Sequence, residues 1–289
     1  MPKALWCAAP LLLLGTAAFA AATINDPNQN AYGAHIGWIN ARGEGTNGMA
    51  VGQSFCTGNA WSANCGWISL GHGPTNGWQY SNASANDWGV NHDGEGRLAG
   101  CAWGANIGWI VFEQTRGQPR VDLHTGILSG YAWSANAGWI GFSNAQAFVQ
   151  TDTLAPGPDT DHDGIPDDWE MERAGDLTIL GGSYADGDPV PDVDEYAADT
   201  DPLTSEHLEI VSLATANGTN TVSWNSRPTR LYRVEATNML ARPPAGGAWA
   251  DVGGGLIGPP AASPAQAAIP QAGATSRFYR VKAVVPLSE

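Results

Sequence analysis

The sequence predicts a mainly β protein, and three features of the 289-residue chain point to that class. Glycine is abundant, with 37 residues, and only 14% of the residues are charged. The chain contains 13 tryptophans, many of which stand in a motif that recurs along the sequence. Many turn formers, many aromatic residues and few charged helix formers together favour short antiparallel strands.

Residues 1–20 are predicted to form a secretory signal peptide. Lys3 precedes the apolar run Ala4–Leu14, and Ala18-Phe19-Ala20 provides a small-residue cleavage site after Ala20. The alternative is a membrane anchor, but the apolar run is shorter than the roughly 20 residues that a spanning helix needs. We therefore expect a secreted or cell-surface protein whose mature chain has no membrane span.

Residues 21–150 are predicted to form a Trp-rich β-repeat domain. The motif A-W-[SG]-A-N-x-G-W-I occurs three times, and a weaker copy precedes these three. The copies are Ala31–Ile39, Ala60–Ile68, Ala102–Ile110 and Ala132–Ile140. The motif Asn and Gly suit left-handed backbone positions, so the five residues between the two tryptophans predict a hairpin loop. The two indoles should then face each other across the strands.

Each repeat is expected to provide about three antiparallel strands, including strands near Val90 and Val121, with an inserted loop over Gly73–Asp87. One such unit cannot bury its own apolar face, so a propeller-like, prism-like or solenoid arrangement is expected. The fixed register with Ala, Gly and Ile favours the motif tryptophans as repeat core. Alternatively, exposed indoles stack on sugar rings, and Trp78 and Trp88, outside the motif, are the candidate ligand contacts.

Three cysteines remain after removal of the signal peptide: Cys56, Cys65 and Cys101. In an oxidising compartment one pair could form a disulfide and leave one thiol over. The alternative is that all three are small buried side chains. The sequence does not choose the pair, and it does not choose between these two possibilities.

Residues 151–206 are predicted to form an acidic calcium-binding linker. The chain has a net charge of −15, and the stretch Asp152–Glu206 holds 17 Asp or Glu residues against a single basic residue, Arg173. A localised acidic segment indicates cations as partners. Nucleic acid is not expected as a partner, because its binding requires a basic surface.

Within this segment, Asp159–Glu170 matches the twelve-residue loop D-x-D-x-D-G-x-x-D-x-x-E of EF-hand calcium sites. The predicted ligands are the side chains of Asp159, Asp161, Asp163, Asp167 and Glu170 and the main-chain carbonyl of Ile165. Calcium prefers six to eight oxygen ligands, which a loop bent at Gly164 can supply. A solvated acidic linker without metal is the alternative.

A second, degraded loop ends at Glu195. Its predicted ligands are Asp186, Asp188, Val190 through its carbonyl, Asp192 and Glu195. Tyr184 stands where the first aspartate belongs, and Pro189 replaces the turn glycine. Short helices are expected over Trp169–Ala174 and Asp194–Ala198.

Residues 207–289 are predicted to form a β-sandwich-like module. The expected strands are Leu208–Leu213, Thr219–Trp224, Leu231–Ala236, Trp249–Val252 and Arg277–Val284, and the expected core residues are Trp224, Tyr232, Val234, Trp249, Phe278 and Val281. The stretch Pro259–Pro270, rich in Pro and Ala, is expected to be a loop.

The loop D-x-D-x-D-G-x-P-D-x-W-E resembles thrombospondin type 3 calcium repeats over residues 159–202. Together with the GWI-type Trp-rich repeats and the terminal pattern W-x7-Y-R-V-E, it is similar to secreted proteins of Verrucomicrobia-like bacteria. This resemblance implies a calcium-stabilised extracellular structure with a fibronectin type III-like C-terminal module. It implies no chemistry.

Catalytic motifs are absent from the sequence, which contains no H-E-x-x-H, G-x-S-x-G, phosphate-binding glycine loop or Cys-x-x-Cys pair. We therefore expect a calcium-binding structural or adhesive protein without catalytic activity, with extracellular polysaccharide or other surface proteins as partners. The alternative function is glycan binding through exposed tryptophans. A third possibility is an extracellular glycoside-active enzyme that uses two converging carboxylates.

Overall fold

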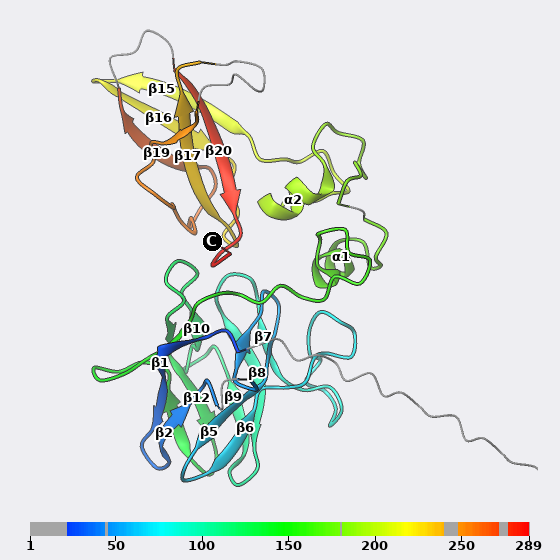
Figure 1. The fold of residues 1–289 in the computed structure, drawn as a ribbon, viewed down its shortest axis with the longest axis vertical. Coiled ribbons are helices and arrows are strands. Elements are labelled where there is room, and N and C mark those ends of the chain that lie inside the picture. Colours follow the sequence, from blue (N-terminus) through cyan, green and yellow to red (C-terminus); the bar gives the residue numbers. More distant parts are fainter. Residues whose placement is uncertain (1–21, 44–45, 180, 240–247, 272–276, 289) are drawn as a thin grey trace, which may run out of the picture.

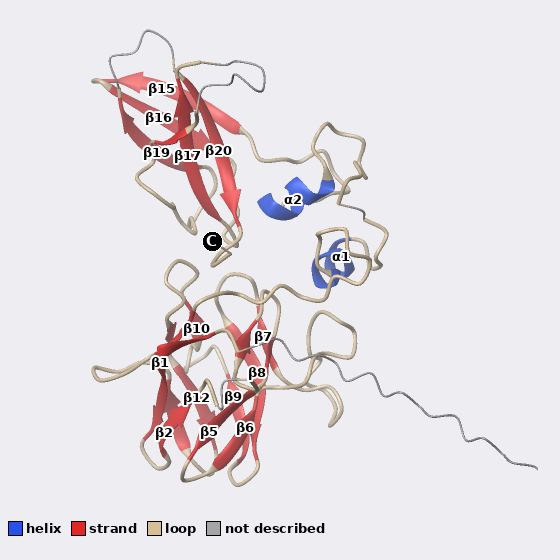
Figure 2. Ribbon diagram, in the orientation of Figure 1, coloured by secondary structure: helices blue, strands red, loops and turns tan. Residues whose placement is uncertain are grey.

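The computed structural model describes residues 22–43, 46–179, 181–239, 248–271 and 277–288. The predicted signal peptide, residues 1–20, lies outside the described residues. The fold is mainly β with antiparallel sheets, as predicted, and the described helices lie in the acidic segment (Figure 2). The Trp-rich region, the acidic segment with its helices and the C-terminal module are distinct parts of the ribbon (Figure 1). Buried apolar side chains form one cluster centred on each of these parts.

The repeats close into an antiparallel barrel, which has eight strands among the described residues. These are β1 (Ile24–Gly33), β2 (Gly37–Asn40), β5 (Asn59–Ser62), β6 (Gly66–Ser69), β8 (Leu98–Gly104), β9 (Gly108–Phe112), β12 (Tyr131–Ser134) and β13 (Gly138–Gly141). Each repeat contributes one hairpin, and β13 pairs with β1 to complete the ring. Closure leaves the eight strands without free sheet edges. A closed barrel differs from the propeller-like, prism-like or solenoid arrangement that we expected.

Short strands outside this closed path extend the barrel. They are β3 (Ala50–Val51), β4 (Cys56–Thr57), β7 (Val90–His92), β10 (Arg120–Val121), β11 (Leu128–Ser129) and β14 (Val149–Thr151). The strands predicted near Val90 and Val121 are therefore present. They pair with β8 and β11 and do not form a third barrel strand in each repeat.

The hairpins bring the motif tryptophans face to face, which confirms that prediction. Trp61 is paired with Trp67, and Ser62 is paired with Gly66, so three residues rather than five remain in the loop. Gly66 has a φ of +75°, a left-handed conformation that favours glycine. The glycine at the same place in the other hairpins has a φ of +72° or +73°.

The motif tryptophans lie on the outside of the barrel, so the prediction that they form the repeat core is wrong. Successive strand residues point to opposite faces, and the motif alternates Ala and Ile with aromatic residues. Ile68 is 5% exposed, whereas Trp61 is 41% exposed. An eight-stranded barrel has a narrow interior. Its Ala and Ile side chains leave an apolar cavity of only about 40 Å³, so the indoles have no room inside.

The motif asparagine links neighbouring hairpins. The bonds run from Asn64 Nδ2 to the Ile36 carbonyl (3.0 Å), from Asn106 Nδ2 to the Cys65 carbonyl (3.1 Å) and from Asn136 Nδ2 to the Ile107 carbonyl (3.0 Å). In the weaker first copy, His35 Nδ1 lies 3.2 Å from the Ala137 carbonyl and completes the ring. This asparagine therefore recurs at the same place in the motif because it bonds to the neighbouring hairpin. We had expected it to occupy a left-handed turn position.

None of the three described cysteines is in a disulfide. Cys56 and Cys65 are buried in the barrel core, and Cys101 is half-buried. Burial raises the pKa of the Cys56 thiol to about 12, so this side chain is an uncharged apolar residue at neutral pH. For Cys56 and Cys65, the structure therefore agrees with the second of the two possibilities, small buried side chains.

The acidic segment contains helices α1 (Asp167–Arg173) and α2 (Asp192–Ala198). Both begin two residues before the predicted start, directly after Pro166 and Pro191. No helix in the described part of the chain is long and apolar enough to cross a membrane.

The described residues of the C-terminal module form two three-stranded antiparallel sheets. One contains β15 (Ile210–Ala216), β16 (Thr219–Trp224) and β19 (Ala265–Pro270), and the other contains β17 (Leu231–Thr237), β18 (Ala250–Asp251) and β20 (Phe278–Val284). Trp224 and Ile269 of the first sheet and Tyr232 and Val234 of the second share one core cluster. The five predicted strands are present.

Three details of the C-terminal prediction are wrong. The expected loop Pro259–Pro270 contains β19, because Ala265, Ala267 and Ile269 alternate toward the core. Small alanines gave too weak an apolar pattern to indicate this strand. Phe278 is 38% exposed at the start of β20, so it is not a core residue. Trp249 is half-buried outside the core cluster, with the Arg280 guanidinium 4.5 Å from its ring centroid.

The motif places Ile68 in the barrel core and Trp61 on its surface. Substitutions at these two positions of one hairpin should therefore lower the free energy of unfolding by different amounts. Ile68→Ala should lower the free energy of unfolding by about 2–5 kcal/mol, because it opens a cavity in the core. Trp61→Ala should cost less, on the order of 1 kcal/mol, because it removes a partly exposed aromatic pair. Chemical denaturation of both variants measures the difference. An equal or larger loss for Trp61→Ala would contradict the outward orientation.

Candidate metal centres

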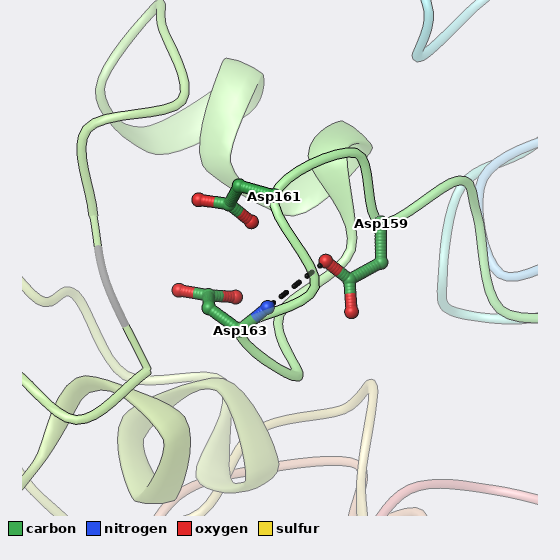
Figure 3. A group of neighbouring side chains, drawn as sticks. All are labelled: Asp159, Asp161 and Asp163. Carbon is green, nitrogen blue, oxygen red and sulfur yellow. Dashed lines mark hydrogen bonds between the residues drawn. The ribbon is translucent and has the colours of Figure 1, made fainter.

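The first acidic loop brings three carboxylates together. Asp159, Asp161 and Asp163 each place one oxygen within 4.8 Å of the others (Figure 3). The backbone turns sharply here, with φ of +60° at His162 and +96° at Gly164. Asp159 stabilises the turn by accepting hydrogen bonds from the N–H groups of Asp163 and Gly164, both at 3.2 Å.

Glu170, the last residue of this loop, is a fully buried carboxylate on α1. Neither of its oxygens has a hydrogen-bond partner among the described residues. Burial, followed by the negative charges of Asp161 and Asp163, raises the pKa of Glu170 to about 7. A buried and unpaired negative charge is strongly unfavourable, so this group requires either a proton or a cation.

The other two predicted ligands of the first loop have different surroundings. The Asp167 carboxylate accepts hydrogen bonds from the N–H of Thr160 at 2.7 Å and from its hydroxyl at 2.6 Å. Asp167 therefore closes the loop on itself. The Ile165 side chain is buried against Trp169 and Ile179, which anchors the middle of the loop.

The second loop repeats the hydrogen-bond pattern of the first. The Asp192 carboxylate accepts from the Ala185 N–H at 3.0 Å and from the Ser183 hydroxyl, as Asp167 does with Thr160. The Val190 N–H donates to Asp188 Oδ1 at 2.7 Å, as the Ile165 N–H donates to Asp163. The degraded sequence therefore keeps these hydrogen bonds of the first loop, although Pro189 cannot adopt the left-handed conformation that Gly164 has at the same loop position.

Unpartnered buried oxygens also occur in the second loop. Asp186 Oδ2 and Glu195 Oε2 have no hydrogen-bond partner among the described residues. Burial, then Asp186 and Asp188, raise the pKa of Glu195 to about 7. The second loop offers fewer candidate calcium ligands than the first. Tyr184, at the position of the first aspartate, is exposed and has no carboxylate, and His207 Nδ1 lies 3.2 Å from Asp188 Oδ2. Within the described residues, only the first loop gathers three acidic ligand atoms within 4.8 Å.

Asp199 joins both helices to the C-terminal module. It ends α2 in the left-handed conformation, with a φ of +58°. Its carboxylate accepts from Trp169 Nε1 at 3.1 Å, from Arg173 Nη2 at 2.8 Å and from the Thr229 hydroxyl. Burial acts to raise the pKa of Asp199, but Arg230, Thr229 and Arg173 hold it below its ordinary value.

Further contacts attach the acidic segment to both neighbours. The buried Arg230 of the C-terminal module donates to the carbonyls of Tyr196 and Ala197, at 2.7 and 3.0 Å. On the barrel side, the Tyr196 hydroxyl donates to Gln53 Oε1 at 3.0 Å. We refer to these contacts, with those of Asp199, as the joint. Sequence reasoning missed the joint, because the partners of Asp199 lie up to 30 residues away.

The two tryptophans predicted as ligand contacts have separate environments. Trp78 lines a cleft of about 170 Å³ between the barrel, the acidic segment and the C-terminal module, together with Arg173 and Arg230. Trp88 packs on the outside of the barrel, with its ring centroid 5.3 Å from that of Trp109.

No protein-family model, curated protein or solved structure matches this chain. The resemblances derived from the sequence motifs therefore stay predictions.

The raised pKa of Glu170 predicts how the metal-free protein responds to pH. The folded state disfavours the ionised carboxylate, so the stability that the neutral form contributes is present below about pH 4.5 and is lost as the pH rises through about 7. In EDTA at pH 8, Glu170→Gln should therefore unfold at a higher temperature than the wild type. The gain should be on the order of 3 kcal/mol at most.

The matched control is Glu172→Gln, which removes the same charge from an exposed position on α1. Thermal unfolding of both variants at pH 8 and at pH 4.5 makes the comparison. If the two variants behave alike at pH 8, Glu170 does not carry an unfavourable buried charge.

Proposed function

We propose that this chain is a secreted or cell-surface structural or adhesive protein whose acidic segment binds calcium and fixes the C-terminal module to the barrel. The observation that carries the proposal is the Glu170 carboxylate, which is fully buried, has no partner and lies in the field of three converging aspartates. Calcium is favoured over softer metals because every candidate ligand is an oxygen atom.

In the first loop, the carboxylates of Asp159, Asp161, Asp163 and Glu170 would hold the ion together with the carbonyl of Ile165. Asp167 shapes the loop through Thr160, and its contact with the ion would run through a water molecule, as is common at this loop position. The bound ion supplies the positive charge that Glu170 otherwise lacks.

In the second loop, Asp186, Asp188 and Glu195 would act in the same way, with the carbonyl of Val190. Asp192 takes the part that Asp167 takes in the first loop. Occupation of this loop should be weaker, because no carboxylate stands at the position of Tyr184 and because Asp188 already contacts His207.

The joint gives calcium a mechanical role. The helix that carries Glu170 also carries Trp169 and Arg173, both of which bind Asp199. Asp199 in turn binds Thr229 of the C-terminal module. Calcium that orders the first loop would therefore also fix Trp169 and Arg173, which hold Asp199 and through it the C-terminal module. For extracellular modules with a Kd of 0.1–1 mM, about 1 mM calcium stabilises the bound state by roughly 0.4–1.4 kcal/mol per site.

Glycan binding is a second candidate function, and the outward orientation of the barrel tryptophans favours it. It does not compete with the first, because the aromatic residues lie in the barrel and the candidate calcium ligands lie in the acidic segment.

Calorimetric titration of metal-free protein with calcium tests the proposed site. The wild type should take up calcium, and Asp161→Ala combined with Glu170→Ala should lose the stronger uptake because it removes two ligands of the first loop. Magnesium should substitute poorly, since it requires tighter octahedral geometry.

A control for the change in charge is Glu172→Ala combined with Glu209→Ala, two exposed residues outside both loops. This control should bind calcium as the wild type does. Equal calcium uptake by the wild type and the Asp161/Glu170 variant would refute the assignment of the first loop.

A further inference from the structure

The outside of the barrel carries aromatic side chains that the fold does not bury. The Trp103–Trp109 and Trp133–Trp139 pairs have ring centroids 4.8 and 5.0 Å apart, and each of these four residues is at least 39% exposed. Aromatic pairing across strands explains why the rings meet. Pairing does not explain why these rings remain exposed to solvent. Contiguous exposed apolar patches often mark the binding site of a partner or ligand.

Beside Trp133 and Trp139 the surface forms an open groove of about 510 Å³. The apolar lining of the groove consists of the two indoles and Val111. The polar lining comes from Glu113, Thr115 and Arg116 after β9, which we call the polar side. The groove therefore combines flat aromatic faces with hydrogen-bonding groups, the combination typical of small-ligand sites.

The polar side of this groove is held in place before any ligand binds. The Glu113 carboxylate accepts hydrogen bonds from the N–H groups of Gly117 and Thr115, both at 2.7 Å, and of Arg116 at 3.0 Å. These bonds, that of Gly117 first, lower the pKa of Glu113, so it is ionised at neutral pH. Arg116 is exposed and forms no ion pair in the described part of the chain, which leaves its guanidinium free to donate.

We propose that this groove binds a neutral oligosaccharide. A pyranose ring has an apolar C–H face that fits an indole, and its hydroxyl groups would bond to Glu113 and Arg116. An acidic polysaccharide or nucleic acid is disfavoured because the ionised Glu113 carboxylate lines the groove and would repel it.

The aromatic surface also indicates the size of the ligand. Val111 lies directly opposite Trp133 in the neighbouring strand, and Trp109 precedes it on the same face of β9. Trp88 packs on Trp109, so a row of apolar groups leads from the groove toward Trp88. This row fits a chain of several sugar units better than a single ring.

A protein partner fits this surface less well. Elsewhere on the barrel, the polar residues Asn40 and Ser69 stand opposite Trp61 and Trp103. These polar residues separate one aromatic pair from the next, so the apolar surface is not continuous. A stable protein interface needs a continuous area of about 800 Å² on each partner. The proposal gives the second candidate function a definite site, and it is independent of calcium because every groove residue lies in the barrel.

The test is titration of the full chain with four neutral hexasaccharides of the cello-, xylo-, manno- and malto- series, followed by calorimetry and tryptophan fluorescence. At least one of them should bind at millimolar concentration or below. Trp139→Ala should weaken that binding by about tenfold or more. Arg116→Met, which keeps the aliphatic stem and removes the donors, should weaken it by a smaller factor and should leave folding unchanged because the position is exposed.

The matched control is Trp38→Ala, which removes an indole that is 49% exposed, compared with 39% for Trp139, from the hairpin β1–β2 and should change the affinity by less than about twofold. Binding should be the same in calcium and in EDTA, which separates this site from the calcium proposal. The assignment of this groove would be wrong if Trp38→Ala and Trp139→Ala weakened binding equally, or if Trp139→Ala and Arg116→Met had no effect. The glycan would then bind at another site on the protein. Absence of binding by all four sugars would overturn both the groove and glycan binding.

Discussion

Two buried glutamates, Glu170 and Glu195, are the electrostatic constraint on which the proposed role of the acidic segment depends. Each has a raised pKa and at least one carboxylate oxygen without a partner among the described residues. Each also belongs to a short helix whose other residues hold the joint, through Trp169 in α1 and Tyr196 in α2. Neutralising these charges therefore has consequences beyond the loops, because the same helices contact the barrel and the C-terminal module.

The barrel follows a different constraint, the small width of its interior. Alanine and isoleucine fill that space, and the larger indoles are left on the outside, where they pair across each hairpin. The asparagine of each complete motif then bonds to the preceding hairpin. One nine-residue motif thus supplies a strand pair, an apolar core layer, a link between hairpins and an aromatic surface, and none of these features includes a residue of the acidic loops.

The parts of the structure that depend on neighbouring residues could be predicted from the sequence. These include the hairpins, the first loop and most C-terminal strands. The closure of the barrel could not be predicted, because β1 and β13 are separated by more than 100 residues. The orientation of Trp61 was also missed, since alternation alone does not say which face is inside. The joint at Asp199 was missed because Trp169 and Thr229 lie on either side of it, far along the chain.

Small-angle X-ray scattering of the full chain, with and without calcium, tests the central claim that the ion fixes the module through the joint. Calcium should reduce the maximum dimension and narrow the distribution of shapes for the wild type, because the helices that hold Thr229 and Gln53 become ordered. The variant Asp161→Ala with Glu170→Ala should respond to calcium much less than the wild type, because only the weaker second loop remains. Identical wild-type profiles with and without calcium, at concentrations where calorimetry shows binding, would contradict the account.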